Sequence, residues 1–381
     1  MLVDSLDGTG GAERFAVGLA LALPREEFDV GVCVTHTAEG SLPAELEAAG
    51  VSCLQLGRRG RWDLLPLRRL GAILRAHRID VLHCHKFGSN VWGSLIGRLA
   101  GVPVIVAHEH TWSYHGQPLR KFLDGQVIGR LAHAFVAVSD ADRRRMIAIE
   151  GVAPRKAITI PTGFVPRPRA AEGNLRAELG ISADSPVVGT VTALRPQKAL
   201  EVLLDAFALL RVTMPNAELV VVGDGPSRKT LEAHARGLGL TGVHFTGVRN
   251  DLAVLLDGID VAAMSSDYEG LPLFAFECLH HRTPLVATAV GGLPDLIQDN
   301  RTGLLVAPRD PDALAEALEG LLRDPERRAR MAGAALETLA DYSMEQIAAR
   351  FGRLYGQLLT GAARGSRPPI SRELTGSVPG A

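Results

Sequence analysis

The chain has 381 residues, more than the roughly 250–300 at which one hydrophobic core stops growing, so about two domains are expected. Its 41 Lys and Arg residues balance 42 Asp and Glu residues, and no basic excess indicates nucleic acid as a partner. The four cysteines form no CxxC pair, no apolar run reaches the length of a membrane-spanning helix, and no signal-peptide pattern opens the chain. We therefore expect a cytoplasmic protein.

The first half of the chain alternates apolar strand patterns with helical patterns, which is typical of a parallel sheet with crossover helices. Strands are expected at residues 28–35, 80–84, 102–108, 134–138 and 157–160, and a helix at residues 64–77. Only residues 1–6 are available for an initial strand, so we expect the native chain to begin a few apolar residues earlier. The Pro- and Arg-rich residues 161–169 cannot continue either element type and mark the expected domain boundary.

The second half repeats the alternation. Strands are expected at residues 186–193, 217–223, 243–246, 259–265, 284–289 and 303–306. A last amphipathic helix is expected at residues 343–359, and the tail from Gly361 has a composition typical of disorder. The predicted fold class is α/β, with two Rossmann-like, doubly wound domains facing a cleft. In such sheets ligands bind beyond the carboxyl ends of the strands.

The segment from Ser265 to Pro284 predicts a phosphate site at a helix start. An apolar strand ends at Ser265, a polar loop follows, and Pro272 is expected in the first helical position, where its missing N–H costs nothing. The backbone amides of Leu271 and Leu273 would then be free donors at the positive end of a helix.

Two carboxylates flank this predicted phosphate site. Glu269 and Glu277 have seven residues between them, and an ionised carboxylate accepts hydrogen bonds from two vicinal hydroxyls of a sugar or ribose. The alternative is that Glu269 caps the helix and Glu277 faces solvent. Glu277 lies between Phe276 and Cys278 in an apolar helix, however, and a buried unpaired carboxylate is costly, so the functional interpretation is favoured.

Two cations stand at the expected junction of strand 186–193 with the next helix. Arg195 and Lys198 would neutralise a diphosphate and stabilise it as a leaving group. The alternative is an ordinary lysine at a helix start, which the helix dipole disfavours. The chain has only five lysines, which also favours a functional role for this one.

Two glycine-rich turns are weaker signals. The turn at residues 7–14 opens the first expected helix, and its glycines would let a ligand approach the backbone. The turn at residues 223–225 has only part of a dinucleotide fingerprint and is interpreted as a strand–helix turn.

Four histidines are expected on one side of the first sheet. His83 and His85 end one strand, His108 and His110 end another, and each pair projects to one face. A zinc site is one interpretation, although Cys84 and Glu109, the nearest further ligands, point to the other face. A single histidine that hydrogen-bonds substrate is the favoured alternative.

Taken together, these motifs resemble the glycosyltransferase family 4 group of retaining, nucleotide-sugar-dependent enzymes with the two-domain GT-B architecture. The resemblance runs from Gly10 to about Leu359 and includes GGAER at 10–14, DVLHCH at 80–85, ALRPQK at 193–198, the Glu-x7-Glu element and TGLLV at 302–306. It implies an acceptor-binding domain at residues 1–165, onto which a helix at 343–360 packs back. A donor-binding domain at 166–342 and a disordered tail at 361–381 complete the expected organisation.

The resemblance also implies roles for single residues. Arg195 and Lys198 would bind the diphosphate, Glu269 the donor sugar and Glu277 the ribose. The other implied residues are Gly247, Gly270, Leu271 and Leu273 around the donor, and Gly11 and His110 as acceptor and transfer-centre residues, with Gly11 also counted among the donor-binding residues. No metal or other cofactor is expected, because the family needs none. The partners expected are a nucleotide sugar and a glycan, lipid-linked or small-molecule acceptor, with a role in cell-surface polysaccharide or glycoconjugate biosynthesis.

Four positions depart from the usual family pattern, namely Thr162, Ala199, Arg282 and Asp295. Arg282 stands at a helix end that usually takes glycine. An arginine in the left-handed conformation there would cost about 1 kcal/mol, so we expect that helix to end differently.

Two alternatives to this function remain open. A nucleotide-sugar epimerase of the same architecture is one, and a non-catalytic nucleotide-binding protein is another.

Residues 58–69 place five arginines beside Trp62 and several leucines, a composition expected at an anionic lipid surface. The other interpretation of this segment, a crossover helix whose arginines face water, is favoured because Asp63 and Pro66 interrupt the patch.

Overall fold

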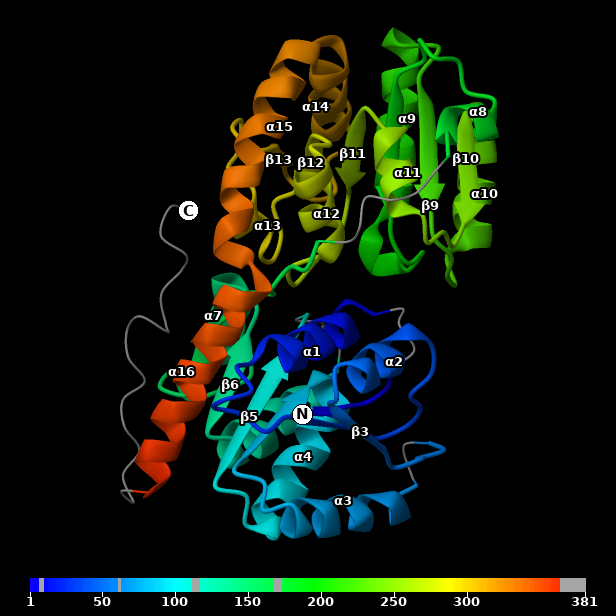
Figure 1. Ribbon diagram of the computed structural model, residues 1–381. Coiled ribbons are helices and arrows are strands. Elements are labelled where there is room, and N and C mark those ends of the chain that lie inside the picture. The colour runs from blue at the N-terminus through cyan, green and yellow to red at the C-terminus, as the bar shows by residue number, and fades with distance from the viewer. Residues whose placement is uncertain (7–9, 61–62, 112–116, 167–172, 364–381) are drawn as a thin grey trace. The chain divides into compact units, whose positions relative to one another are not determined.

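The computed structural model describes residues 1–6, 10–60, 63–111, 117–166 and 173–363 (Figure 1). The chain divides into two compact units, one of residues 1–165 with the segment from Asp341 onward, the other of residues 166–340. The division falls inside the Pro- and Arg-rich stretch 161–169. No helix in the described ranges is both long and apolar enough to cross a membrane.

The first unit contains a parallel sheet, seven-stranded among the described residues, with the order β3-β2-β1-β4-β5-β6-β7. Its strands are β1 (Leu2–Val3), β2 (Gly31–Val34), β3 (Ser52–Gln55), β4 (Val81–His85), β5 (Val104–Glu109), β6 (Ala134–Ala137) and β7 (Ala157–Thr159). The winding reverses between β1 and β4, which are neighbours at the centre, so their carboxyl ends form the switch point of this sheet. Edge strand β3 was not predicted, because its residues are mostly exposed and lack an apolar alternation.

Helices cover both faces of this sheet. They are α1 (Gly11–Ala22), α2 (Ser41–Ala48), α3 (Leu65–Ala76), α4 (Lys86–Ala100), α5 (Pro118–Phe122), the π-helix η1 (Leu123–Ile128), α6 (Gly129–Leu131), α7 (Asp140–Ala148), the 3-10 helix η3 (Ala340–Tyr342, at the junction of the two units) and α16 (Met344–Ala363). Alternate residues of β5 serve two cores, with Val104 and Val106 against α1 and α16 and Ile105 and Ala107 on the opposite face. The sheet is therefore buried on both sides.

The last helix packs on α1 and β5 of the first unit, although the second unit separates it from them in sequence. Its Phe351, Leu354 and Tyr355 are buried. Placing the start of a disordered tail at Gly361 was wrong, because α16 continues to Ala363. The rest of that tail, residues 364–381, lies outside the described residues.

The second unit contains a parallel sheet, six-stranded among the described residues, with the order β10-β9-β8-β11-β12-β13. Its strands are β8 (Val187–Val191), β9 (Glu218–Val222), β10 (Val243–Gly247), β11 (Val261–Met264), β12 (Leu285–Thr288) and β13 (Leu304–Val306), each within a few residues of its predicted range. Its helices are α8 (Leu175–Leu179), the 3-10 helix η2 (Pro196–Lys198), α9 (Leu200–Thr213), α10 (Arg228–Gly237), α11 (Leu252–Asp257), α12 (Leu273–His281), α13 (Leu293–Leu296), α14 (Pro311–Arg323) and α15 (Pro325–Leu339). The switch point lies between β8 and β11.

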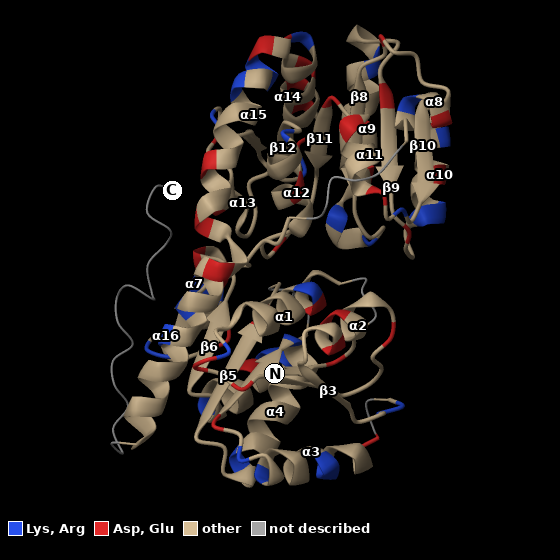
Figure 2. Ribbon diagram, viewed as in Figure 1, with Lys and Arg blue, Asp and Glu red and all other residues tan. Residues whose placement is uncertain are grey.

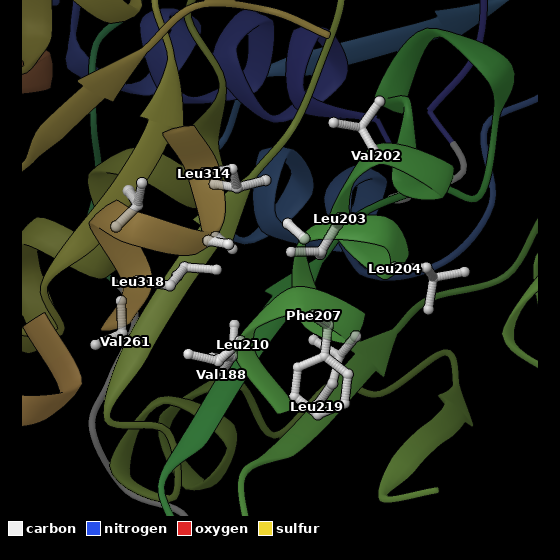
Figure 3. Packing of buried hydrophobic residues seen from close by; sticks show 14 of the residues in the cluster. Val188, Val202, Leu203, Leu204, Phe207, Leu210, Leu219, Val261, Leu314 and Leu318 are labelled. Atoms are coloured by element: carbon white, nitrogen blue, oxygen red, sulfur yellow. The ribbon is translucent and has the colours of Figure 1, made fainter. Parts of the chain in front are cut away.

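The core of the second unit lies under α9 and α14. Figure 3 shows buried side chains of both helices, among them Phe207 and Leu318, in one cluster with the sheet residues Val188 and Val261. Phe207 is fully buried, and truncating a buried phenylalanine to alanine costs about 3–5 kcal/mol. This packing fixes β8 and β11, and with them the loops that leave their carboxyl ends.

Several non-glycine residues of the second unit adopt left-handed backbone conformations, among them Ala199 and Arg282 with φ of 46° and 59°. The expectation that α12 would avoid this conformation at Arg282 was wrong, because α12 ends at His281 and Arg282 follows in the left-handed region. Glycine is the residue that tolerates this region without strain.

Candidate active site

Lys198 and Glu269 meet at the switch point of the second sheet. Lys198 follows β8 and Glu269 follows β11, and the lysine Nζ donates to both carboxylate oxygens at 2.7 and 2.9 Å. Ser266 Oγ donates to Glu269 Oε1 at 2.5 Å. The side chains of Glu269 and Lys198 are 4% and 17% exposed, so the ion pair is largely desolvated. Sequence reasoning selected both residues but did not predict their contact, which joins positions 71 residues apart.

The two loops that carry this pair are hydrogen-bonded to each other. Ser265 Oγ donates to the Lys198 carbonyl oxygen at 3.0 Å, and the Asp267 amide donates to the Gln197 carbonyl oxygen at 2.9 Å. Thr288, at the end of β12, donates its hydroxyl to the Ser266 carbonyl oxygen at 2.6 Å. The lysine and the carboxylate are therefore held from several directions.

Gly291 supports the Glu269 loop from the next strand connection. It has φ of 57°, and a Cβ at this position would lie 1.9 Å from the Glu269 carbonyl oxygen. The neighbouring Gly292 amide donates to the Gly270 carbonyl oxygen at 2.7 Å. Glycine is required at position 291 because no side chain fits against this loop.

The start of α12 offers backbone amides beside this pair. Pro272 is the N-cap residue rather than the first helical residue as expected, and the helix begins at Leu273. The amides of Leu273 and Phe274 lie in the first turn, where the helix provides no acceptor, whereas the Ala275 amide donates to the Pro272 carbonyl oxygen. Together with the Leu271 amide in the preceding loop, these amides provide this edge of the sheet with hydrogen-bond donors suited to binding an anion.

The remaining predicted site residues of this unit differ in how far they are exposed to solvent. Glu277 is 3% exposed between two fully buried neighbours on α12, so it does not face solvent. Arg195 is exposed at the start of η2, and its guanidinium has no partner in the described part of the chain. Gly247 ends β10, and its carbonyl oxygen accepts from the amide of Gly223 in the turn between β9 and α10, as expected for that turn.

The first unit carries an ion pair at its own switch point that sequence reasoning missed. Lys86, directly after β4, donates its Nζ to Oε1 of Glu13, which is 4% exposed on α1. The backbone of Lys86 has φ of 70°, and a Cβ on Gly10 would lie 1.8 Å from Glu13 Oε2. Gly11 is exposed as the first residue of α1. The pair joins positions 73 residues apart, so no local pattern could have revealed it.

The four predicted histidines form one cluster beside this pair. His83 Nδ1 contacts the Tyr355 hydroxyl at 2.7 Å, and His85 Nδ1 contacts His110 Nε2 at 3.1 Å. Burial lowers the pKa of His110 to about 3 and holds the pKa of the other three well below the usual value. His110 is therefore a neutral hydrogen-bonding group at neutral pH, not a cation.

His83, His85 and His108 each offer one ring nitrogen within 4.8 Å of the others, which raises the question of a metal. Their neutral state is the one that binds metals. The rings of His83 and His108, however, are stacked with an interplanar angle of 7°. Lone pairs lie in the ring planes, so those of two stacked rings run parallel and do not converge on one ion. We assign His83, His85 and His108 to packing.

In the segment at residues 58–69, one of the five arginines is buried, which neither interpretation of the segment predicted. Arg58 is 5% exposed, donates to the carbonyl oxygens of Asp63 and Gly60, and lies 5.6 Å from the ring centre of Trp92. It is therefore unavailable to a lipid surface. Residues 61–62 lie outside the described residues, and α3 carries the arginines Arg68, Arg69 and Arg75 along its length (Figure 2).

Comparison with known proteins places this geometry in a family. Residues 172–338 match the description "Glycosyl transferases group 1", and residues 9–167 match "Glycosyltransferase Family 4". The D-inositol 3-phosphate glycosyltransferase of Kineococcus radiotolerans is 30% identical over 372 residues, covering 84% of each chain. The chain belongs to the group 1 glycosyltransferases. The enzyme of the same name from Corynebacterium urealyticum is 37% identical to this glycosyltransferase over 225 residues, which are 56% of this chain and 52% of that one.

Solved structures show the same architecture. The Anabaena Alr3699/HepE protein in complex with UDP-glucose superposes on this glycosyltransferase with a TM-score of 0.79 at 23% identity, covering 93% of this chain and 99% of that one. The two Rossmann-like units are thus those of a GT-B glycosyltransferase, as the sequence predicted.

Proposed function

We propose that this enzyme transfers a hexosyl group from a nucleoside diphosphate sugar to an acceptor hydroxyl, with retention of anomeric configuration. The Lys198–Glu269 ion pair beside the first-turn amides of α12 carries this proposal. The lysine and the amides stabilise the departing diphosphate, and the carboxylate holds hydroxyls of the donor sugar. UDP-glucose bound to HepE makes this nucleotide sugar the first donor to test.

Other residues complete the proposed site. Arg195 is exposed and able to turn toward the diphosphate, and Glu277 binds the ribose. Gly247, Gly270 and Leu271 line the donor. These cations and amides neutralise the diphosphate without a metal ion, so we expect turnover to be unaffected by a chelator.

The acceptor binds the first unit in this proposal, near Gly11 and His110. A glycan, a lipid-linked sugar or a small polyol would meet a neutral imidazole and the Glu13–Lys86 pair there. Relatives named for D-inositol 3-phosphate make cyclitol phosphates the first small acceptors to test. A role in cell-surface polysaccharide or glycoconjugate biosynthesis is part of the proposal.

The test is a screen of nucleotide sugars that records which one releases its diphosphate, with and without acceptor. Lys198→Ala is expected to lower turnover by about 10²–10³, the effect of removing one oxyanion-stabilising group. Lys229→Ala, at an exposed lysine of the same unit, serves as the matched control. Inactivity with every donor, together with no binding by calorimetry, would contradict the proposal.

The products separate the alternatives. An epimerase converts the nucleotide sugar into its epimer without releasing the nucleoside diphosphate. A non-catalytic protein binds the nucleotide sugar and leaves it unchanged. The anomeric proton coupling of the transfer product, measured by NMR, tests retention.

Within residues 58–69, the start of α3 is the part that we propose for a peripheral contact with an anionic membrane. Leu64 and Leu65 are 48% and 70% exposed at the start of α3, and Arg68 and Arg69 are exposed beside them. Flotation with anionic vesicles at low salt, lost in an Arg68→Ala/Arg69→Ala variant, would support this contact over a helix whose arginines face water. No flotation at low salt would contradict it and favour a water-soluble acceptor.

A further inference from the structure

Arg309, in the loop between β13 and α14, holds two acidic residues that neighbour the active-site pair in sequence. Its Nε donates to Asp267 Oδ1 at 2.5 Å, its Nη2 donates to Asp267 Oδ2, and its Nη1 donates to Glu201 Oε1 at 2.7 Å. Asp267 stands two residues before Glu269, and Glu201 stands three residues after Lys198. One guanidinium therefore joins both segments that carry the pair.

The contact has features that an incidental surface ion pair lacks. Arg309 has φ of 62°, a conformation that costs a non-glycine residue about 1–3 kcal/mol and persists only when its surroundings hold it. Its fork is bidentate on one carboxylate and has a third bond to another, a geometry that the single charge of lysine cannot reproduce. Exposed single ion pairs contribute little, but three charges in one network are the exception.

Asp267 is also tied to the lysine loop through its backbone. Its amide donates to the Gln197 carbonyl oxygen, and Gln197 Nε2 donates to the Tyr268 carbonyl oxygen at 3.3 Å. A shift of Asp267 would therefore move the residues on either side of the Lys198–Glu269 contact. Without the guanidinium, the carboxylates of Asp267 and Glu201 would face each other as like charges and push the two segments apart.

We propose that Arg309 is a positioning residue for the Lys198–Glu269 pair. It acts through the two segments and makes no contact with the donor itself. This inference rests on the proposed function, since it concerns the geometry in which that pair meets a nucleotide sugar. Misplacing a catalytic group by about 1 Å can cost about 10²-fold in rate, so the clamp has a measurable effect on turnover.

The experiment compares Arg309→Gln, Arg309→Lys and the double variant Arg309→Gln/Asp267→Asn with the unmodified enzyme. Arg301→Gln is the matched control, because it breaks another exposed ion pair of the same unit, with Glu337. We expect kcat for UDP-glucose to fall at least tenfold in Arg309→Gln and less in Arg309→Lys. The double variant should recover part of the loss, because one of the facing charges is removed. A thermal melt of each variant checks that it is folded.

Hydrogen exchange of the peptide at residues 265–272 gives a second readout that does not need activity. It should become faster in Arg309→Gln and stay unchanged in Arg301→Gln. The inference is wrong if kcat in Arg309→Gln stays within twofold of the unmodified enzyme. It is also wrong if kcat falls by the same factor in Arg309→Gln and in the control Arg301→Gln. If the unmodified enzyme uses no donor, the proposed function fails, and the exchange result alone then decides whether the clamp holds this loop.

Discussion

The histidine cluster predicts how the stability of the first unit depends on pH. His83, His85, His108 and His110 are buried as neutral rings with lowered pKa values, whereas in the unfolded chain each takes up a proton near pH 6.5. A lowered folded-state pKa contributes stability that is present above pH 6.5 and is lost as the pH falls. From pH 7.5 to 5.5 the loss is on the order of 1 kcal/mol for each histidine, and several kcal/mol for the four together. That is comparable with the whole stability of many domains.

Two groups oppose this trend. Burial raises the pKa of Asp124 to about 8 and also raises the pKa of Glu109, so the folded state binds these protons more tightly and is favoured as the pH falls. The test must therefore isolate the histidines by comparing variants. His108→Leu removes one of the four protons and leaves Asp124 unchanged. The pH-dependent loss of His108→Leu between pH 7.5 and 5.5 should be smaller, by on the order of 1 kcal/mol, than that of the unmodified chain.

The assay is urea unfolding followed by tryptophan fluorescence. All three tryptophans, at positions 62, 92 and 112, belong to the first unit, so the signal reports on that unit. His77→Gln, at an exposed histidine of the same unit, is the control and should follow the unmodified chain. Parallel pH curves for His108→Leu and the unmodified chain would refute the reasoning.

Three further predictions concern the second unit. Lys198→Met leaves Glu269 as a buried carboxylate without its cation, so we expect a loss of about 3–5 kcal/mol in urea unfolding. Glu269→Gln added to that variant should restore part of the loss, and strictly additive effects would contradict the pairing. Arg282→Gly should stabilise the unit by about 1 kcal/mol because it relieves a left-handed residue at an exposed position, and an unchanged melting curve would contradict this. Gly291→Ala should lower turnover sharply, because its Cβ would collide with the Glu269 carbonyl oxygen; activity equal to the unmodified enzyme would show that the loop adapts.

The sequence predicted the parts of the fold that have a local signal. Buried strands such as β5 and β9 are recognisable in the sequence as apolar runs. The turn at 223–225 has the glycines that are typical of a strand–helix turn. Edge strand β3 has neither signal, since its pairing with β2 comes from the sheet alone. The left-handed Arg282 was missed for a related reason, because the turn from the end of α12 into β12 places it there despite a backbone preference of about 1 kcal/mol.

The active site divides in the same way. Lys198 and Glu269 could be selected from the motifs around them, since their residue types and positions after strands indicate a phosphate and a sugar site. Their contact could not be predicted, because it depends on the β8–β11 pairing. The Lys86–Glu13 pair was missed entirely, since a lysine after a strand and a glutamate in a helix are common separately.

The position of α16 sets the order in which the chain can fold during synthesis. The first unit leaves the ribosome early, but Phe15, Val104 and Ile158 remain uncovered until α16 has been made. At about 5–20 residues per second, the intervening second unit takes on the order of ten seconds to synthesise. The second unit has its own core and all of its strands before α16 emerges. The domain that begins first therefore finishes last, and a nascent chain stalled within the second unit would present an apolar face for a chaperone to bind.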